Sequence, residues 1–109
     1  MIEALENIHV MDGEPVATEH VRTALTAGGF IYGDGATQVF EPAGATTYVQ
    51  QGQQTRGEWY LDASGHFCSF WPPSYRACYE LRWIVEEGRI AGLRFTELGQ
   101  GSCFDGRYR

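Results

Sequence analysis

Turn-forming residues interrupt the chain about every 8–12 residues from Gly29 onward, and this spacing restricts the fold more than any other feature. Glycine, proline and aspartate supply the turns. Between them lie short runs of aromatic and β-branched residues, which favour strands. Runs this closely spaced are typical of an all-β sandwich or barrel. We expect strands at about residues 30–32, 37–41, 46–50, 56–62, 66–71, 76–85, 89–97 and 102–108.

The connections between these runs are short enough for hairpins, and consecutive hairpins can remove their exposed edges by closing into a barrel. We therefore predict an antiparallel up-and-down β-barrel of about eight strands over residues 30–108. One short α-helix is expected at about residues 16–27, where Thr18 can cap its start and Val21 and Leu25 share one face. The 109 residues are then a single domain, 1–109.

Charge and composition exclude several classes of function. The chain has 14 acidic and 8 basic side chains, a formal charge of −6 and no basic cluster, which argues against a nucleic-acid partner. Every basic residue is an arginine, so a lysine Schiff base and a phosphate-loop lysine are ruled out. No apolar run approaches 18 residues, so no transmembrane helix is expected.

Hairpin symmetry relates two of the three cysteines. If a turn centres on Pro73, Cys68 lies opposite Cys78, and paired residues of an antiparallel ladder are within disulfide reach. If residues 62–65 form the preceding turn, Trp59 lies opposite Cys68. We expect a Cys68–Cys78 disulfide stacked on Trp59, which would contribute about 2–3 kcal/mol. The alternative is three reduced, mostly buried thiols.

Three segments resemble a group of small bacterial β-barrel proteins, in which a G-x-W strand precedes a C-x-x-W strand and a C-Y strand. They are residues 57–60 (GEWY), 65–71 (GHFCSFW) and 78–81 (CYEL). The G-x-W element is also similar to that of the calycins, the lipocalin-like ligand carriers. The resemblance implies a lipocalin-like barrel, a disulfide and export, but no activity. Because residues 1–10 do not form a signal peptide, two locations are left open: the bacterial periplasm, if a signal was removed, or the cytoplasm.

Alternation along the central hairpins defines two sheet faces. The more aromatic and less charged face should be the interior, since such residues are usually buried. In calycins, however, the G-x-W tryptophan points inward, which favours the face with Trp59. One β-bulge would reconcile these expectations, and both are left open. The aromatic face carries Glu58, Tyr60, Phe67, Ser69, Trp71, Tyr75, Ala77, Tyr79, Leu81, Trp83 and Val85.

The leading functional interpretation is a ligand cavity, because an eight-stranded barrel can hold one small ligand. Tyrosine and tryptophan provide apolar walls with a polar tip. We expect Tyr60, Trp71, Tyr79 and Trp83 to line this cavity, and Arg94 to bind an anionic end of a small apolar or amphipathic ligand. The alternative is a filled core in a structural or protein-interaction module, which could form a homodimer.

Support for catalysis or metal binding is weak, because no motif brings together enough suitable side chains. We therefore expect a non-enzymatic protein with no cofactor and no metal. A small-barrel enzyme stays open as a third class. The groups available are His66 with Cys68 as a metal pair, Cys103 with His66 or His20 as a thiol–imidazole pair, and His66, Tyr79 and Glu80 at a barrel mouth.

Overall fold

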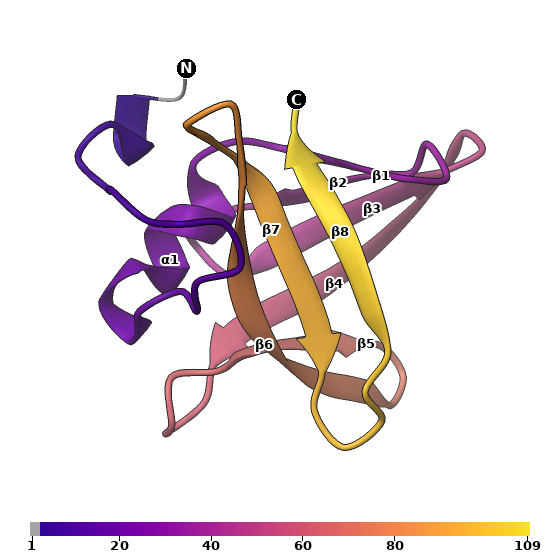
Figure 1. Cartoon of the computed structure of the whole chain (residues 1–109). Helices are drawn as coiled ribbons and strands as arrows, with labels where there is room; N and C mark the ends of the chain where they lie inside the picture. The colour runs from indigo at the N-terminus through magenta and orange to yellow at the C-terminus, as the bar shows by residue number, and fades with distance from the viewer. Residues whose placement is uncertain (1–2) are drawn as a thin grey trace.

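The computed structural model describes residues 3–109. It is a closed antiparallel barrel in which each strand pairs with the next and β8 pairs with β1, so the predicted fold class is confirmed (Figure 1). Within residues 3–109, no helix is long and apolar enough to cross a membrane. The elements are a 3₁₀ turn (Glu3–Leu5), α1 (Thr18–Thr26), β1 (Phe30–Tyr32), β2 (Thr37–Phe40), β3 (Ala45–Gln50), β4 (Gln53–Leu61), β5 (Phe67–Trp71), β6 (Tyr75–Glu86), β7 (Arg89–Glu97) and β8 (Cys103–Tyr108).

Helix α1 covers one end of the barrel. It buries Val21, Ala24 and Leu25 in the core, which explains why its apolar stripe is narrow. The guanidinium of Arg22 stacks over the Trp59 ring at 4.9 Å. The expected capping role of Thr18 is wrong, because Ala17 occupies the N-cap position and no side chain caps the helix. The tertiary contacts of the buried face therefore stabilise α1 more than its own ends do.

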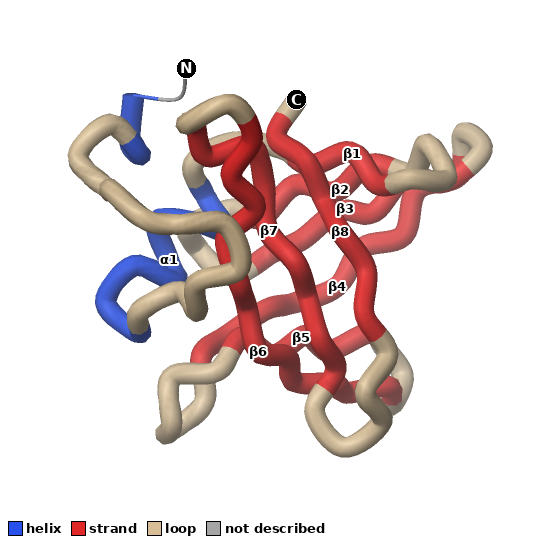
Figure 2. The backbone as a smooth tube through the Cα atoms, viewed as in Figure 1, coloured by secondary structure: helices blue, strands red, loops and turns tan. Residues whose placement is uncertain are grey.

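The segment before α1 extends the sheet beside β6. Strand β5 pairs with β6 only as far as Tyr79, although β6 continues to Glu86. The backbone of residues 13–16 takes over there: the Gly13 amide donates to the Trp83 carbonyl and the Trp83 amide donates to the Glu14 carbonyl, each at 2.9 Å. This loop lies along β6 (Figure 2) and closes the wall at the helix-covered end.

The register of β4 and β5 differs from the predicted one by a single residue. Trp59 pairs with Ser69 and Tyr60 pairs with Cys68, so Trp59 does not lie on the disulfide. The reason is the connection, which has five residues (62–66) rather than four. The Asp62 carboxylate accepts the Ser64 and His66 amides, which holds His66 in the turn.

This shift settles which face is inside. Trp59 is buried on the same side of the sheet as Phe67, Tyr79 and Trp83, so no bulge between β4 and β5 is needed. The expected aromatic face is inside on β5 and β6, but its β4 members Glu58 and Tyr60 are outside, because Trp59 points inward. One extra residue in a turn exchanges the face of the sheet that is paired across it, as a one-residue register slip does.

The predicted disulfide is confirmed. Cys68 and Cys78 are directly opposed in the β5–β6 ladder and are joined, while Cys103 is a free, exposed thiol. Because Ser69 points inward, its neighbour Cys68 lies on the outer face of the barrel. The bridge therefore fastens the β5–β6 hairpin from outside.

The barrel interior has two parts. Beneath α1 lies a packed end, defined by the buried side chains of Leu25, Phe30, Trp59, Trp83 and Leu93. Away from α1 lies an open end that contains a cavity. Phe40, Phe67 and Phe95 belong to the core cluster and also line this cavity, so they form the boundary between the two parts.

Candidate functional site

A cavity of about 900 Å³ occupies the open end of the barrel and communicates with solvent. Its opening follows from the length of β1. Strand β1 has three residues, and its pairing with β8 ends at Tyr32 opposite Gly106. Cys103, Phe104 and Asp105 of β8 therefore have no β1 partner, and the wall is open between them and the turn at residues 33–35.

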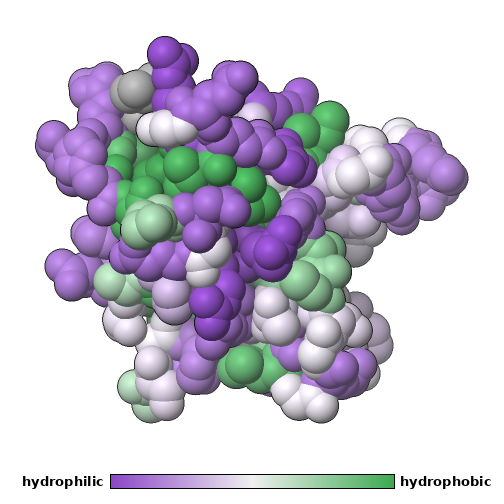
Figure 3. Space-filling model, viewed as in Figure 1, coloured by the Kyte–Doolittle hydropathy of each residue, from purple (hydrophilic) through white to green (hydrophobic). Residues whose placement is uncertain are grey.

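The outline of the molecule is indented on this side, between the tips of the β1–β2 and β3–β4 hairpins and the β7–β8 hairpin (Figure 3). We call this opening the mouth, bordered by residues 32–34 and 103–105.

Aromatic rings form a large part of the cavity wall. Phe95 and Phe104 are stacked with ring centroids 5.1 Å apart, and Phe67 and Tyr79 are stacked at 5.4 Å. The remaining contacts among these rings are mostly edge-to-face, the other arrangement that aromatic quadrupoles favour. The aromatic residues that line the cavity are Tyr32, Phe40, Tyr48, Phe67, Trp71, Tyr79, Phe95 and Phe104.

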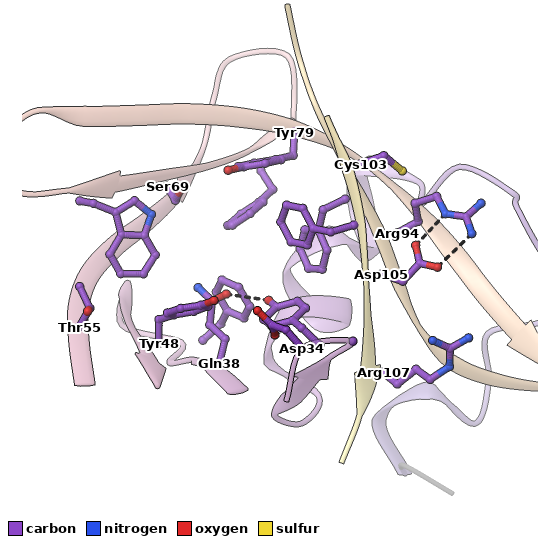
Figure 4. A pocket seen from close by; sticks show the side chains of 17 residues that line it. Asp34, Gln38, Tyr48, Thr55, Ser69, Tyr79, Arg94, Cys103, Asp105 and Arg107 are labelled. Carbon is purple, nitrogen blue, oxygen red and sulfur yellow. Dashed lines mark hydrogen bonds and ion pairs between the residues drawn. The ribbon is translucent and has the colours of Figure 1, made fainter. Parts of the chain in front are cut away.

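A polar relay begins in the wall opposite Tyr79, where Figure 4 shows Gln38, and continues behind the wall to Thr46. The Tyr32 hydroxyl donates to Gln38 Oε1 at 2.6 Å, Gln38 Nε2 donates to the Thr46 hydroxyl at 2.9 Å, and Thr46 donates to the Val39 carbonyl at 2.8 Å. Because each link is satisfied, these polar groups can be buried without a large desolvation cost. The relay fixes the Tyr32 ring at the mouth.

The tyrosines of the cavity hold their protons at neutral pH. Burial raises the pKa of Tyr79 to about 12, with smaller contributions from Tyr75 and Glu97. Burial also raises the pKa of Tyr32 well above its usual value, and the neighbouring Tyr48 and Tyr79 hydroxyls add to the rise. Burial is likewise the main reason that the pKa of Tyr48 is raised, followed by the charge of Asp34. These hydroxyls can therefore donate hydrogen bonds but are not bases at neutral pH.

Ion pairs neutralise both arginines that border the cavity. Arg94 donates from Nε and Nη2 to the two carboxylate oxygens of Asp105, at 2.7 and 3.0 Å. Arg107 binds the Glu86 carboxylate at 2.6 Å. The Arg94 guanidinium correspondingly lowers the pKa of Asp105. The charge of each guanidinium is therefore balanced by a carboxylate, which weakens its attraction for a further anion.

Three of the five predicted ligand-binding residues border the cavity. Trp71 and Tyr79 belong to its wall, and Arg94 lies at its rim in the pair with Asp105. Tyr60 does not line it: the one-residue shift between β4 and β5 places Tyr60 on the outer face, where its hydroxyl accepts a hydrogen bond from Arg76 at 2.9 Å. Trp83 points inward but lies in the packed end, 1% exposed.

Several cavity residues were not anticipated. Tyr32, Gln38 and Tyr48 come from β1, β2 and β3, and Phe104 comes from β8. Strand alternation alone would have found them, since residues 38 and 40 alternate inward on β2, and 104, 106 and 108 on β8. The sequence interpretation considered only the central hairpins.

The other candidate groups do not form a joint site in the described residues 3–109. Cys68 is in the disulfide, which leaves Asp62 as the free member of the cluster with Cys68 and Cys78 and removes the proposed His66–Cys68 metal pair. His66 pairs with Asp62 at 3.4 Å in the β4–β5 turn. The Cys103 thiol instead contacts the Thr96 hydroxyl at 3.7 Å.

A second hollow lies beside the N-terminal segment, where Figure 3 shows an apolar patch. It is bordered by aliphatic side chains such as Ile8, Val10 and Ile90, and by the charged Glu86 and Arg89. We take the first cavity as the candidate site, because it combines a wall of aromatic rings with ordered polar groups. No protein-family model, curated protein or solved structure matches this chain.

Proposed function

We propose that this protein binds a small, partly apolar ligand in the open end of the barrel, without catalysing a reaction. The observation that carries the proposal is the aromatic cavity of about 900 Å³, a size and a lining typical of small-molecule sites. The alternative of a completely filled core is not supported, because the interior is filled at one end only.

The cavity wall suits an apolar body with few polar groups. Eight aromatic side chains offer dispersion contacts and ring stacking, and the Tyr32–Gln38–Thr46 relay is already satisfied internally. Thr55 and Tyr48 add hydroxyl groups to the lining. A ligand that buried about 200 Å² of apolar surface here would gain roughly 5 kcal/mol before the costs of association.

Adjacent residues of β4 offer a matched test. Thr55 lines the cavity and is exposed, so Thr55→Trp should fill the cavity without disturbing the core. Gln54 is its neighbour on the opposite face and is not part of the lining, so Gln54→Trp adds the same indole outside the barrel. The probe is N-phenyl-1-naphthylamine, an uncharged aromatic molecule that fluoresces in apolar surroundings.

We expect saturable probe binding to the unmodified protein. Thr55→Trp should weaken it at least about tenfold through the lost volume, whereas Gln54→Trp should change it less than about twofold. Absence of saturable binding, or equal binding by both variants, would contradict the proposal. Native mass spectrometry of protein purified without reductant adds a second measurement, since mass lost on denaturation would identify a co-purified ligand.

A further inference from the structure

The charged side chains around the mouth differ in whether an opposite charge neutralises them. Arg94 and Arg107 are neutralised by Asp105 and Glu86 in bidentate or near-bidentate pairs. A third acid, Asp34, also lines the cavity. Its carboxylate accepts the Ala36 amide at 3.0 Å and the Gln50 side-chain amide at 3.1 Å, both of which are uncharged. Among the ion pairs of residues 3–109, none includes Asp34.

The charge of this carboxylate acts on Tyr48, which belongs to a group of electron-rich rings. Tyr48 is 6.3 Å from Tyr32 and 6.4 Å from Trp71, measured between ring centroids, and all three line the cavity. The charge of Asp34 contributes to the raised pKa of Tyr48, which places a negative potential at that hydroxyl. Aromatic faces attract cations, and tryptophan and tyrosine do so most strongly.

We propose that the ligand of this cavity is an organic cation, with an ammonium group held at the mouth by Asp34 and Tyr48 and an apolar body against Trp71 and the inner rings. This inference rests on the proposed function, and it replaces the expected role of Arg94. An anionic ligand is disfavoured, because the guanidiniums at the rim are paired and the protein carries a formal charge of −6.

The mouth and the deeper part of the cavity suit different parts of a ligand. The mouth is partly exposed, so an ammonium group there keeps part of its hydration while it meets the carboxylate and the ring faces. The deeper wall is made of Phe40, Phe67 and Phe95, which provide no charge partner. A ligand with its charge at one end therefore fits better than one that is charged in its middle.

Three probes that share one ring system test the sign of the charge. They are 2-naphthylmethylamine, which is a cation at neutral pH, 2-naphthalenemethanol, which is uncharged, and 2-naphthoate, which is an anion. Each is titrated against the complex of the protein with N-phenyl-1-naphthylamine. We expect the cation to bind about tenfold more tightly than the alcohol, with the anion weakest. Added salt should reduce the preference for the cation over the alcohol and leave binding of the alcohol itself unchanged.

The outcomes separate the two proposals. If the fluorescent probe itself does not bind, the proposed function fails. If the fluorescent probe binds but the amine does not displace it, or the alcohol or the naphthoate displaces it as well as the amine does, the inference about charge is overturned and the binding function stands.

A pair of isosteric variants tests the residue. Asp34→Asn removes the charge but keeps an oxygen for the Ala36 amide, and Asp62→Asn makes the same change in a turn of the same kind, where Asp62 accepts the Ser64 amide at 2.9 Å. Asp62 does not line the cavity. We expect Asp34→Asn to weaken binding of the amine about threefold to fivefold and to leave the alcohol unchanged. Asp62→Asn should change neither, and equal effects of the two variants on the amine would overturn the role of Asp34.

Discussion

The two ends of this barrel are built from the same kinds of residue, yet one is solid and the other hollow. At the packed end, Phe30, Trp59 and Trp83 are at most 3% exposed beneath α1. At the open end, Tyr32, Trp71 and Phe104 are equally large but remain partly exposed around a cavity. Aromatic content therefore does not decide between core and cavity in this chain.

The difference comes from the elements that cover each end. At the packed end, α1 supplies the buried side chains of Val21 and Leu25. The backbone of residues 13–16 completes the wall beside β6. The open end has neither, and the short β1 leaves half of β8 without a β1 partner. An eight-stranded barrel can keep a cavity at one end when its covering elements lie at the other end only.

The largest expected effect comes from truncating a side chain at each end. Leu25→Ala should lower the free energy of unfolding by about 2–5 kcal/mol, because Leu25 is fully buried against the packed end. Phe104→Ala should cost about 1 kcal/mol, since Phe104 is 41% exposed. Urea unfolding measures both values. Probe affinity should fall more for Phe104→Ala than for Leu25→Ala. A larger loss of stability for Phe104→Ala than for Leu25→Ala would mean that the open end is also a core.

The disulfide should matter mainly to the open end, because the β5–β6 hairpin that it joins carries Ser69, Trp71 and Tyr79. Replacing Cys68 and Cys78 together by alanine should cost about 2–3 kcal/mol, the chain-entropy value for a loop of about ten residues. Hydrogen exchange should accelerate more in this hairpin than in α1.

Cys103→Ala is the control for the disulfide, since Cys103 is free. Unmodified protein should show one titratable thiol in denaturant without reductant. Three thiols, or unchanged stability of the double variant, would contradict the structural role of the bridge.

Strand positions and the disulfide were predictable because they depend on local signals: turn residues, alternation and the symmetry of one hairpin. The β5–β6 turn, with three residues between Trp71 and Tyr75, kept the expected register. The β4–β5 turn did not, because two hydrogen bonds to Asp62 add His66 to the loop and thereby move Tyr60 outside.

The candidate site was harder to predict because it depends on distant pairings. The partner of Arg94 is Asp105 on the next strand, and no spacing within one strand signals that contact. The position of Trp83 depends on α1 and on residues 13–16 of the N-terminal segment, which decide the end of the barrel that is filled. The length of β1, only three residues, decides where the wall opens.

Gly57 of the G-x-W element connects the sequence pattern to the cavity. An added Cβ would lie 2.5 Å from the Trp71 ring and 2.8 Å from the Phe70 carbonyl oxygen. Gly57→Ala should therefore push Trp71 from its place in the wall, at a cost of about 1–3 kcal/mol, and weaken probe binding. Gly33→Ala is the control for stability alone, since Gly33 borders the mouth. Its added Cβ would meet nothing within 4 Å, so the free energy of unfolding should change by less than about 0.5 kcal/mol. If Gly57→Ala bound the probe with unchanged affinity, Trp71 would not be part of the binding wall.

The smallest expected effect is that of pH near neutrality. Both ends contain buried tyrosines whose pKa is raised by burial: Tyr79, to about 12, at the open end and Tyr108 at the packed end. A raised pKa in the folded state means that stability is complete below the ordinary value of 10.0 and is lost as pH rises above it.

Affinity for the uncharged probe should therefore vary less than about twofold between about pH 6 and pH 9, and fall only as the tyrosines ionise. Parallel titrations of probe fluorescence and tyrosinate absorbance measure this. At the packed end, the Tyr108 hydroxyl donates to the Ala24 carbonyl, so its ionisation should accompany release of α1. A change in probe affinity near pH 7 would instead contradict control of the cavity by its tyrosines. That result would replace the contrast between a packed and an open end with one between a titrating mouth and an inert core.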